Sequence, residues 1–107
     1  MLIASTIVAM IHEVVFKRQA LEHLQWLPVH HQRLVTDGIR RHLMESDPRT
    51  ETRNKFRLRR TSESADYELR LGDLRVLYRI EESVVFITVV GIKRGNTLIV
   101  KGEEFPL

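Results

Sequence analysis

A chain of 107 residues has the length of one domain, because domains cluster near about 100–150 residues. Its composition, 43% hydrophobic and 29% charged, is that of a globular protein and excludes a disordered chain. The sequence has no cysteine, which excludes disulfide frameworks, thiolate zinc sites, iron–sulfur clusters and cysteine nucleophiles. The absence of cysteine also fits a reducing, cytoplasmic compartment. The net charge of +3 is mild.

Residues 2–11 form an apolar run with only about half of the roughly 20 residues that a membrane-spanning helix needs. No lysine or arginine precedes the run, so it also lacks the charged start of a signal peptide. We therefore expect no membrane role for this segment. Residues 1–10 are interpreted either as an extension ahead of a start at Met10 or as part of a longer first strand, and residues 11–107 as a single domain.

The first half of this domain is predicted to contain one strand and two helices. Ile11–Phe16 is rich in β-branched and aromatic residues, which favours a strand. Apolar residues at helical spacing then predict an amphipathic helix over Lys17–Leu27, which Pro28 ends. A second helix follows and stops near residues 46–48, and the two helices form a helical hairpin. The apolar stripe of the second helix consists of Val35, Ile39, His42 and Leu43.

The second half of the chain changes to a period of two, which predicts strands. After a polar connector at 49–54, strands are expected at Lys55–Arg59, Tyr67–Leu71, Leu74–Ile80 and Val84–Val90. Gly72-Asp73 is a hairpin turn, Gly91–Asn96 a basic loop, and Leu98–Val100 a short apolar strand in the tail. The predicted fold class is α+β, in the order β-α-α-β-β-β-β: a twisted, mostly antiparallel sheet with the N-terminal helical hairpin packed on one face.

The side chains of a strand alternate between the two faces of a sheet, so the pattern assigns each residue to a face. The core face is expected to hold Phe56, Leu58, Tyr67, Leu69, Leu71, Leu74, Val76, Tyr78 and Ile80. The opposite, open face then receives seven charged residues, six of them positive: Lys55, Arg57, Arg59, Glu68, Arg70, Arg75 and Arg79. Such a face can simply meet water. Because like charges on neighbouring strands repel, however, an arginine-rich face favours a polyphosphate ligand, above all nucleic acid.

Two other features give weaker signals. His12-Glu13 begins like a zinc-protease motif, but the position of the second histidine is Phe16, so we expect no metal site. Trp26 is interpreted as a core aromatic at the end of a helix rather than as a platform on which RNA bases stack.

The stretch from Tyr67 to Gly102 resembles the C-terminal half of toxins of the RelE/ParE superfamily, the toxic halves of bacterial type II toxin–antitoxin pairs. The pattern that carries the resemblance is a strand, a turn and an Arg-Val-x-Tyr strand at 75–78, then an apolar strand that ends in Gly91 and a basic loop. The β-α-α order upstream fits as well, so the resemblance covers about residues 11–105 and implies a RelE-like fold.

The resemblance to the RelE-like branch implies a ribosome-dependent mRNA endonuclease, in which a 2′-hydroxyl attacks the adjacent phosphate without a metal or other cofactor. One alternative is a ParE-like poison that binds DNA gyrase and hydrolyses nothing, and another is an inactive or regulatory relative. The implied partners are mRNA, the ribosome and a cognate antitoxin in a hetero-oligomer, with no membrane.

The resemblance also implies roles for individual residues. Arg75 matches the strand arginine that RelE-like toxins direct at the scissile phosphate, and Arg70 matches a catalytic basic residue on the preceding strand. Glu68 falls where RelE itself has its other catalytic basic residue, a lysine, and related branches use a glutamate as base. Lys93 or Arg94 matches the basic residue after the apolar strand, whereas the C-terminal tyrosine of the family has no counterpart. Further residues of the open face are expected to contact RNA, namely Lys55, Arg57, Arg59 and Arg79.

The antitoxin implied by the resemblance is expected to be small, with an acidic amphipathic segment that folds onto the basic open face. Leu98–Val100 is expected either to offer an edge strand to this partner by β-augmentation or to pair within the sheet.

Overall fold

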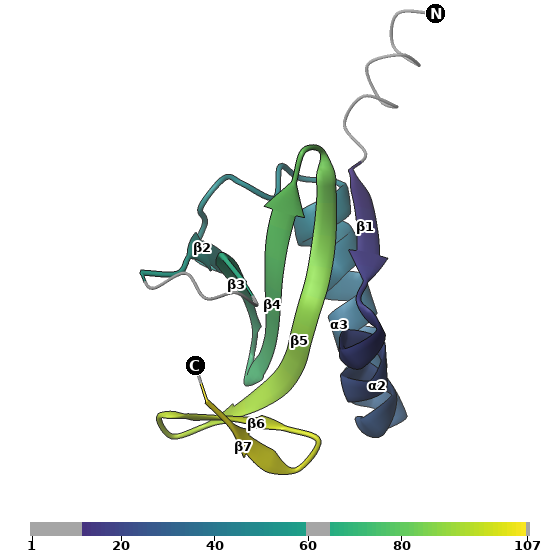
Figure 1. The fold of residues 1–107 in the computed structure, drawn as a ribbon, viewed down its shortest axis with the longest axis vertical. Helices are drawn as coiled ribbons and strands as arrows, with labels where there is room; N and C mark the ends of the chain where they lie inside the picture. The colour runs from purple at the N-terminus through teal and green to yellow at the C-terminus, as the bar shows by residue number, and fades with distance from the viewer. Residues whose placement is uncertain (1–11, 60–64, 107) are drawn as a thin grey trace, which may run out of the picture.

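The computed structural model describes residues 12–59 and 65–106, so the predicted extension and the start of the predicted first strand, at residues 1–11, lie outside the described residues. Helices cover one face of a twisted sheet (Figure 1). The helices are α2 (Arg18–Trp26), α3 (Val29–Ile39) and a π-helical segment, η1 (Arg40–Met44). The strands are β1 (Glu13–Phe16), β2 (Lys55–Arg57), β3 (Tyr67–Leu71), β4 (Leu74–Glu81), β5 (Val84–Arg94), β6 (Thr97–Val100) and β7 (Glu103–Phe105).

Within the described residues the sheet has seven strands, six of them in the order β2-β3-β4-β5-β6-β7. Each neighbouring pair along this path is antiparallel, and β1 pairs with β5 in parallel. The predicted α+β class, the helical hairpin on one face and the mostly antiparallel sheet are confirmed. The strand β7 was not predicted, and β5 continues to Arg94, so the expected basic loop shortens to the turn Gly95-Asn96.

The two helices begin and end close to the predicted positions, because Pro28 separates them. The carbonyl of Pro28 accepts hydrogen bonds from the backbone N–H groups of His31 and Gln32, which starts α3. The Gln32 side chain donates to the carbonyl of Leu27 at 2.8 Å and fixes the turn between the helices. In the part of the chain that the structure describes, no helix is both long enough and apolar enough to cross a membrane.

The main core lies between the helices and the sheet. It is centred on Tyr78, which is fully buried, stacks on Tyr67 with 5.1 Å between ring centroids, and donates to the carbonyl of Pro48 at 2.7 Å. Burial raises the pKa of the Tyr78 hydroxyl above its ordinary value. The other buried members of this core are Ala20, Leu24, Leu27, Val35, Ile39, Leu43, Leu69, Leu74, Val76, Val85, Ile87 and Val90.

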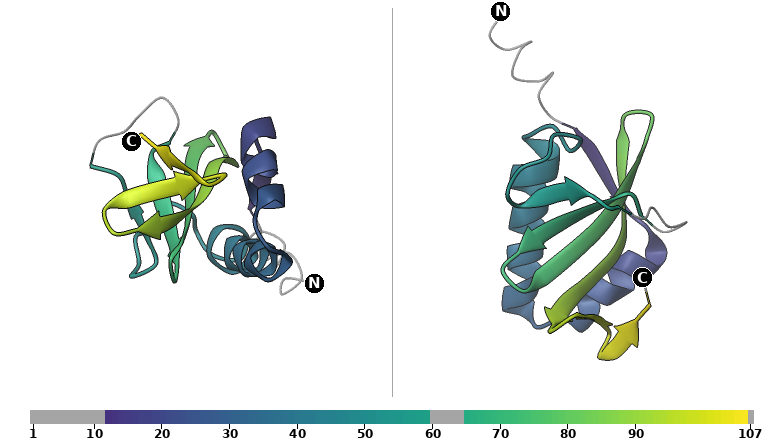
Figure 2. Two further views of the ribbon diagram at one scale, coloured as in Figure 1. Left: turned by 90° about the horizontal axis from the view of Figure 1, so that it is seen from below. Right: turned by 90° about the vertical axis from the view of Figure 1, so that its left-hand side faces the viewer.

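A second apolar cluster covers part of the opposite face of the sheet. This open-face cluster consists of Ala65, Leu77, Val89, Leu98 and Val100. It forms because the β6–β7 hairpin projects from the end of the sheet on the side away from α2 and α3 (Figure 2). Since β6 pairs with β5 on one edge and with β7 on the other, the expectation of β-augmentation at Leu98–Val100 is wrong, and the alternative of pairing within the sheet is confirmed.

The face assignment of β2 was wrong by one residue. Lys55 pairs with Leu69 and is 2% exposed, so it lies on the helix-covered face rather than the open face. Its ammonium donates to the carbonyls of His42 and Asp47, at 2.6 and 2.7 Å. Burial lowers the pKa of Lys55, and Asp47 opposes that shift. The prediction that Lys55 contacts RNA fails for this geometry, because carbonyl groups of the fold already surround its charge.

Arg57 shares the helix-covered face with Lys55, so the prediction that it accompanies Arg70 and Arg75 is also wrong. Its guanidinium lies over the ring of Tyr67, 5.6 Å from the centroid. The alternate residue, Phe56, lies on the open face, where the Arg70 guanidinium is 4.4 Å from its ring centroid. Leu58 packs against the open-face cluster and not the main core, and Arg59 is exposed beyond the end of β2.

The burial of Trp26 and of His42 can be compared with what the sequence predicts for them. Trp26 is 52% exposed, so its interpretation as a core aromatic is wrong. Its ring borders the turn between β6 and β7, where an added Cβ at Gly102 would lie 3.1 Å from it. His42, a member of the predicted apolar stripe, is half-buried, and burial together with the charges of Lys55 and Arg41 lowers its pKa.

His23, which the sequence did not single out, links α2 to the sheet. Its Nδ1 accepts a hydrogen bond from the Val90 N–H at 3.3 Å, and the residue is 9% exposed. Burial, and then the charge of Lys101, lowers its pKa from 6.5. The folded state therefore binds a proton less readily than the unfolded chain, so stability is full above pH 6.5 and falls as the pH drops toward the lowered pKa.

We expect His23→Asn to flatten this pH dependence, because the amide oxygen of asparagine can accept the same N–H bond and does not titrate. The loss of slope should approach about 1.4 kcal/mol per pH unit, the value for one proton. Urea unfolding of both proteins on either side of pH 6.5 measures it. An unchanged slope in the variant would assign the dependence to other groups, of which His42 is the first.

Candidate functional site: a basic hollow on the open face

Four of the predicted site residues meet in one small hollow on the open face. The hollow has a volume of about 80 Å³ and is lined by Glu68, Arg70, Arg75, Lys93, Asn96 and Leu98. These residues come from β3, β4, the end of β5, the turn after it and β6. The pairing of the strands explains their proximity, since Arg70 lies directly opposite Arg75 and Lys93 opposite Leu98.

Gly91 lies on β5, two residues before Lys93, and its lack of a side chain lets β6 approach β5 closely. It pairs with Arg75 on β4, and an added Cβ would lie 2.5 Å from the backbone oxygen of Ile99. Only a residue without a side chain allows this approach. The glycine at the end of the apolar strand, which was part of the family pattern, therefore has a steric role behind the hollow.

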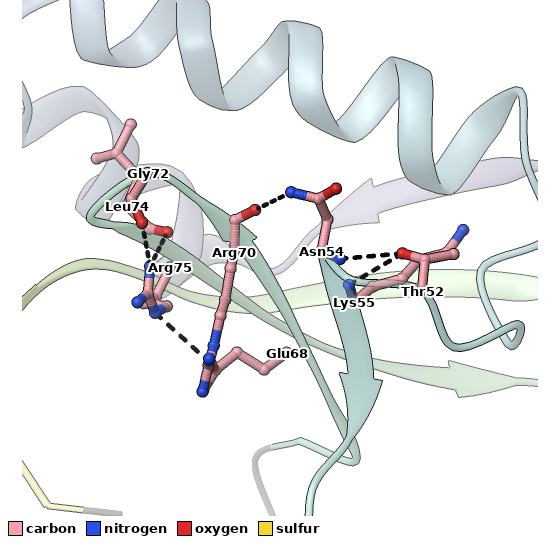
Figure 3. A network of polar contacts seen from close by, with 8 residues as sticks. All are labelled: Thr52, Asn54, Lys55, Glu68, Arg70, Gly72, Leu74 and Arg75. Atoms are coloured by element: carbon pink, nitrogen blue, oxygen red, sulfur yellow. Dashed lines mark hydrogen bonds and ion pairs between the residues drawn. The ribbon is translucent and has the colours of Figure 1, made fainter.

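Glu68 holds the two arginines of the hollow side by side. Its Oε2 accepts a hydrogen bond from Arg70 Nε at 2.8 Å and forms an ion pair with Arg75 Nε at 3.6 Å (Figure 3). The carboxylate side chain is 12% exposed, whereas that of Arg70 is 45% exposed. Two guanidinium groups on paired positions would otherwise repel each other, so the carboxylate stabilises their arrangement.

Arg75 is a fixed, buried cation. The residue is 8% exposed, and its Nη1 donates to the carbonyls of Gly72 at 2.6 Å and Leu74 at 2.9 Å in the β3–β4 turn (Figure 3). Burial lowers the pKa of the guanidinium and Glu68 raises it, but an arginine remains charged near neutral pH. Its buried Nε has no hydrogen-bond partner among the described residues. A buried donor in this state favours an additional acceptor at the site.

Asn54 positions Arg70 from the strand edge, a role that the sequence did not reveal. Its carbonyl accepts from the Arg70 N–H at 2.6 Å, and its side-chain amide donates to the Arg70 carbonyl at 3.2 Å (Figure 3). The Thr52 hydroxyl in turn accepts from the N–H groups of Asn54 and Lys55. The connector that was predicted only as polar therefore fixes the backbone of a site residue.

The structure separates the other predicted residues from the hollow. Arg94 follows Lys93 on β5 but does not line the hollow. It lines a separate groove with His31 and Leu34, to which Lys93 also contributes. Arg79 lies further along the open face, opposite Phe86, and forms an ion pair with Glu81 at 3.1 Å.

The hollow is suited to an anion. It holds three cationic side chains and one carboxylate, a formal net charge of +2, and guanidinium groups match phosphate oxygens in pairs. Within residues 12–59 and 65–106, no group of three or more histidine, aspartate or glutamate side chains is placed to hold a metal ion. Arginines in this arrangement can bind a phosphate, and a carboxylate and a lysine beside them are groups that can transfer protons.

No family model matches the chain, and no curated protein sequence matches it. Solved structures do match it, among them chains of two toxin–antitoxin complexes. A chain of the toxin–antitoxin complex RelBE2 from Mycobacterium tuberculosis is 26% identical, with a TM-score of 0.65 over 78% of this chain and 93% of that one. A chain of the archaeal RelE–RelB complex from Pyrococcus horikoshii OT3 is 30% identical, with a TM-score of 0.60 over 80% of this chain and 98% of that one.

Proposed function

Because the chain belongs to the RelE family of toxins, we propose that it is the toxin of a toxin–antitoxin pair and that it cleaves mRNA in the A site of the ribosome. The observation that carries the proposal is the convergence of Glu68, Arg70, Arg75 and Lys93 on one hollow. An antitoxin that silences the protein has this basic face to cover.

The proposed reaction is a transesterification within the RNA. The 2′-oxygen forms a bond to the adjacent phosphorus, the bond from phosphorus to the 5′-oxygen breaks, and the products are a cyclic phosphate and a 5′-hydroxyl. The reaction needs a base for the 2′-hydroxyl proton, cations for the charge of the pentavalent transition state and an acid for the leaving oxygen.

Each of these needs has a candidate in the hollow. Arg75 and Arg70 bind the phosphate oxygens, which compete with the Glu68 carboxylate for the two guanidinium groups. The carboxylate that is displaced from this ion pair accepts the 2′-hydroxyl proton. Lys93, on the side of β6, donates a proton to the leaving 5′-oxygen.

Mapping mRNA 5′ ends on translating ribosomes after induction of the protein tests this function. Cleavage within codons at stalled A sites is the expected result. DNA breaks and an SOS response without mRNA cleavage would identify a gyrase poison instead, and the absence of both effects would identify an inactive or regulatory relative.

The neighbours Lys93 and Arg94 provide a matched pair of variants. Both lie at the exposed end of β5, and either change to alanine removes one positive charge. Because only Lys93 lines the hollow, Lys93→Ala should lower the single-turnover cleavage rate by about 10²-fold or more, the usual contribution of a general acid. Arg94→Ala should leave the rate close to that of the parent. Equal losses in both variants would indicate that ribosome attraction, and not proton transfer, explains the effect.

A further inference from the structure

The turn between β3 and β4 is joined by hydrogen bonds to two of the cationic residues of the hollow. The carbonyl of Gly72 accepts from Nη1 of Arg75 at 2.6 Å (Figure 3). The next carbonyl, that of Asp73, accepts from the backbone N–H of Lys93 at 2.8 Å. We propose that the turn Gly72-Asp73 is a positioning element of the site, which holds Arg75 and Lys93 in a fixed relation to each other. The inference rests on the proposed function for the roles of these two residues in phosphate binding and proton donation.

The two hydrogen bonds reach beyond the hairpin that the turn closes. The β3–β4 ladder ends at the pair Leu71 and Leu74, and the bond to Gly72 comes instead from the side chain of a buried arginine. The bond to Asp73 comes from β5, a strand that is not part of this hairpin. The turn therefore links the start of β4 to the end of β5, the two strands that carry Arg75 and Lys93.

Gly72 has the backbone conformation on which the turn depends. Its φ is 61°, whereas that of Asp73 is not positive. A positive φ at the first of two central residues is the pattern of a type II′ turn, which has glycine there. The Gly72 carbonyl belongs to the peptide between the two turn residues, and the orientation of that peptide depends on the turn type. A residue that disfavours positive φ would thus redirect the carbonyl that holds Arg75, although a Cβ added at Gly72 meets nothing within 4 Å.

A displaced turn affects both cationic residues at once. The backbone of Lys93 is held by Asp73 on one side and by its pairing with Leu98 on the other, so the turn sets where its side chain starts. The guanidinium of Arg75 loses one of its two turn carbonyls. Because a misplacement of about 1 Å in a site can cost about 10²-fold in rate, the turn acts on cleavage through these two residues.

The turn at the other end of β4 provides a matched control. Glu82 also has a positive φ, of 58°, and its carbonyl accepts from Nη2 of Arg49 at 2.6 Å. Valine disfavours a positive φ at either position, because its side chain is β-branched. Gly72→Val and Glu82→Val therefore impose the same kind of strain and disturb the same kind of bond, but only the Gly72 carbonyl holds a cation of the hollow.

Single-turnover cleavage of mRNA on programmed ribosomes is measured for the parent, Gly72→Val, Gly72→Asn and Glu82→Val. Gly72→Val should lower the maximal rate by about 10²-fold, whereas the ribosome concentration for half-maximal rate should stay near that of the parent, because no charge is removed. Gly72→Asn should recover most of the rate, since asparagine is common at this turn position. Glu82→Val should cleave close to the parent rate. A full rate in Gly72→Val, or an equal loss in Glu82→Val or Gly72→Asn, would overturn the positioning role.

A measurement on the protein without RNA separates this inference from the nuclease function. NMR of the side-chain nitrogens distinguishes a guanidinium that is held in place from one that rotates freely, and exchange of the Lys93 N–H with solvent reports its bond to Asp73. Gly72→Val should lose the distinct Arg75 signals and speed the Lys93 exchange, and Glu82→Val should do neither. If valine prevents folding, Gly72→Ala makes the same comparison with a smaller side chain.

The joint change at Arg75 and Lys93, in a protein that cuts no mRNA, would support the positioning role and contradict only the nuclease. Unchanged Arg75 signals, or unchanged exchange at Lys93, would overturn the positioning role and leave the nuclease function standing.

Discussion

Replacing Arg75 by alanine is expected to lower the cleavage rate by about 10²–10³-fold, the loss seen when one donor to a transition-state oxyanion is removed. The reason is that Arg75 is the buried, fixed cation of the hollow, with two turn carbonyls and the Glu68 carboxylate setting its orientation. A charge fixed in advance needs no reorganisation when the phosphate gains charge. Single-turnover cleavage of an mRNA bound to programmed ribosomes gives the rate.

The same arginine also holds the β3–β4 turn, so the alanine variant alone cannot separate chemistry from folding. Arg75→Lys keeps a cation that can donate to the carbonyls of Gly72 and Leu74, and it should unfold near the temperature of the parent. Its rate should stay low, because an ammonium lacks the paired donors of a guanidinium.

Arg79→Ala provides the control for charge. Arg79 lies on the same strand and face but away from the hollow, so its replacement should change the rate little. If Arg75→Lys cleaves as fast as the parent, the guanidinium has no special role at the phosphate.

Alternation within β3 and β4 was enough to place Glu68, Arg70 and Arg75 on one face. In β3, large apolar residues alternate with charged ones, and the main core is large enough to fix which set turns inward. The turn at Gly72-Asp73 fixed the register of the pair. The site could therefore be predicted where one face of the sheet was clearly the buried one.

The same rule failed in β2, because both faces of the sheet carry apolar clusters. Phe56 and Leu58 were assigned to the main core, but they lie toward the open face, whose cluster depends on the β6–β7 hairpin far along the chain. The residues of β2 do not indicate that a distant hairpin forms an apolar cluster on this face. Lys55 likewise carries no local sign of burial, since its partners are carbonyls within η1 and in the loop after it.

The second largest effect is expected for the stability of the fold, from the replacement of Lys55. Lys55→Ala should lower the free energy of unfolding by about 2–4 kcal/mol, because it leaves two carbonyl acceptors without their donor and opens a cavity. Lys55→Met fills most of the volume, so its cost should be smaller and confined to the lost hydrogen bonds. Equilibrium unfolding in urea measures both variants against the parent.

Arg57 is the matched control, because it lies two residues along on the same strand and the same face, yet is exposed. Arg57→Ala removes an equal charge and should cost far less, since the contacts that are lost are an exposed cation over the Tyr67 ring and a long, 3.5 Å hydrogen bond to the Tyr67 hydroxyl. If Arg57→Ala and Lys55→Ala cost the same, the buried ammonium adds nothing beyond its charge. Below its unfolding temperature, Lys55→Met should still cleave, because the hollow is built on β3 to β6 and not on the ties between β2 and η1.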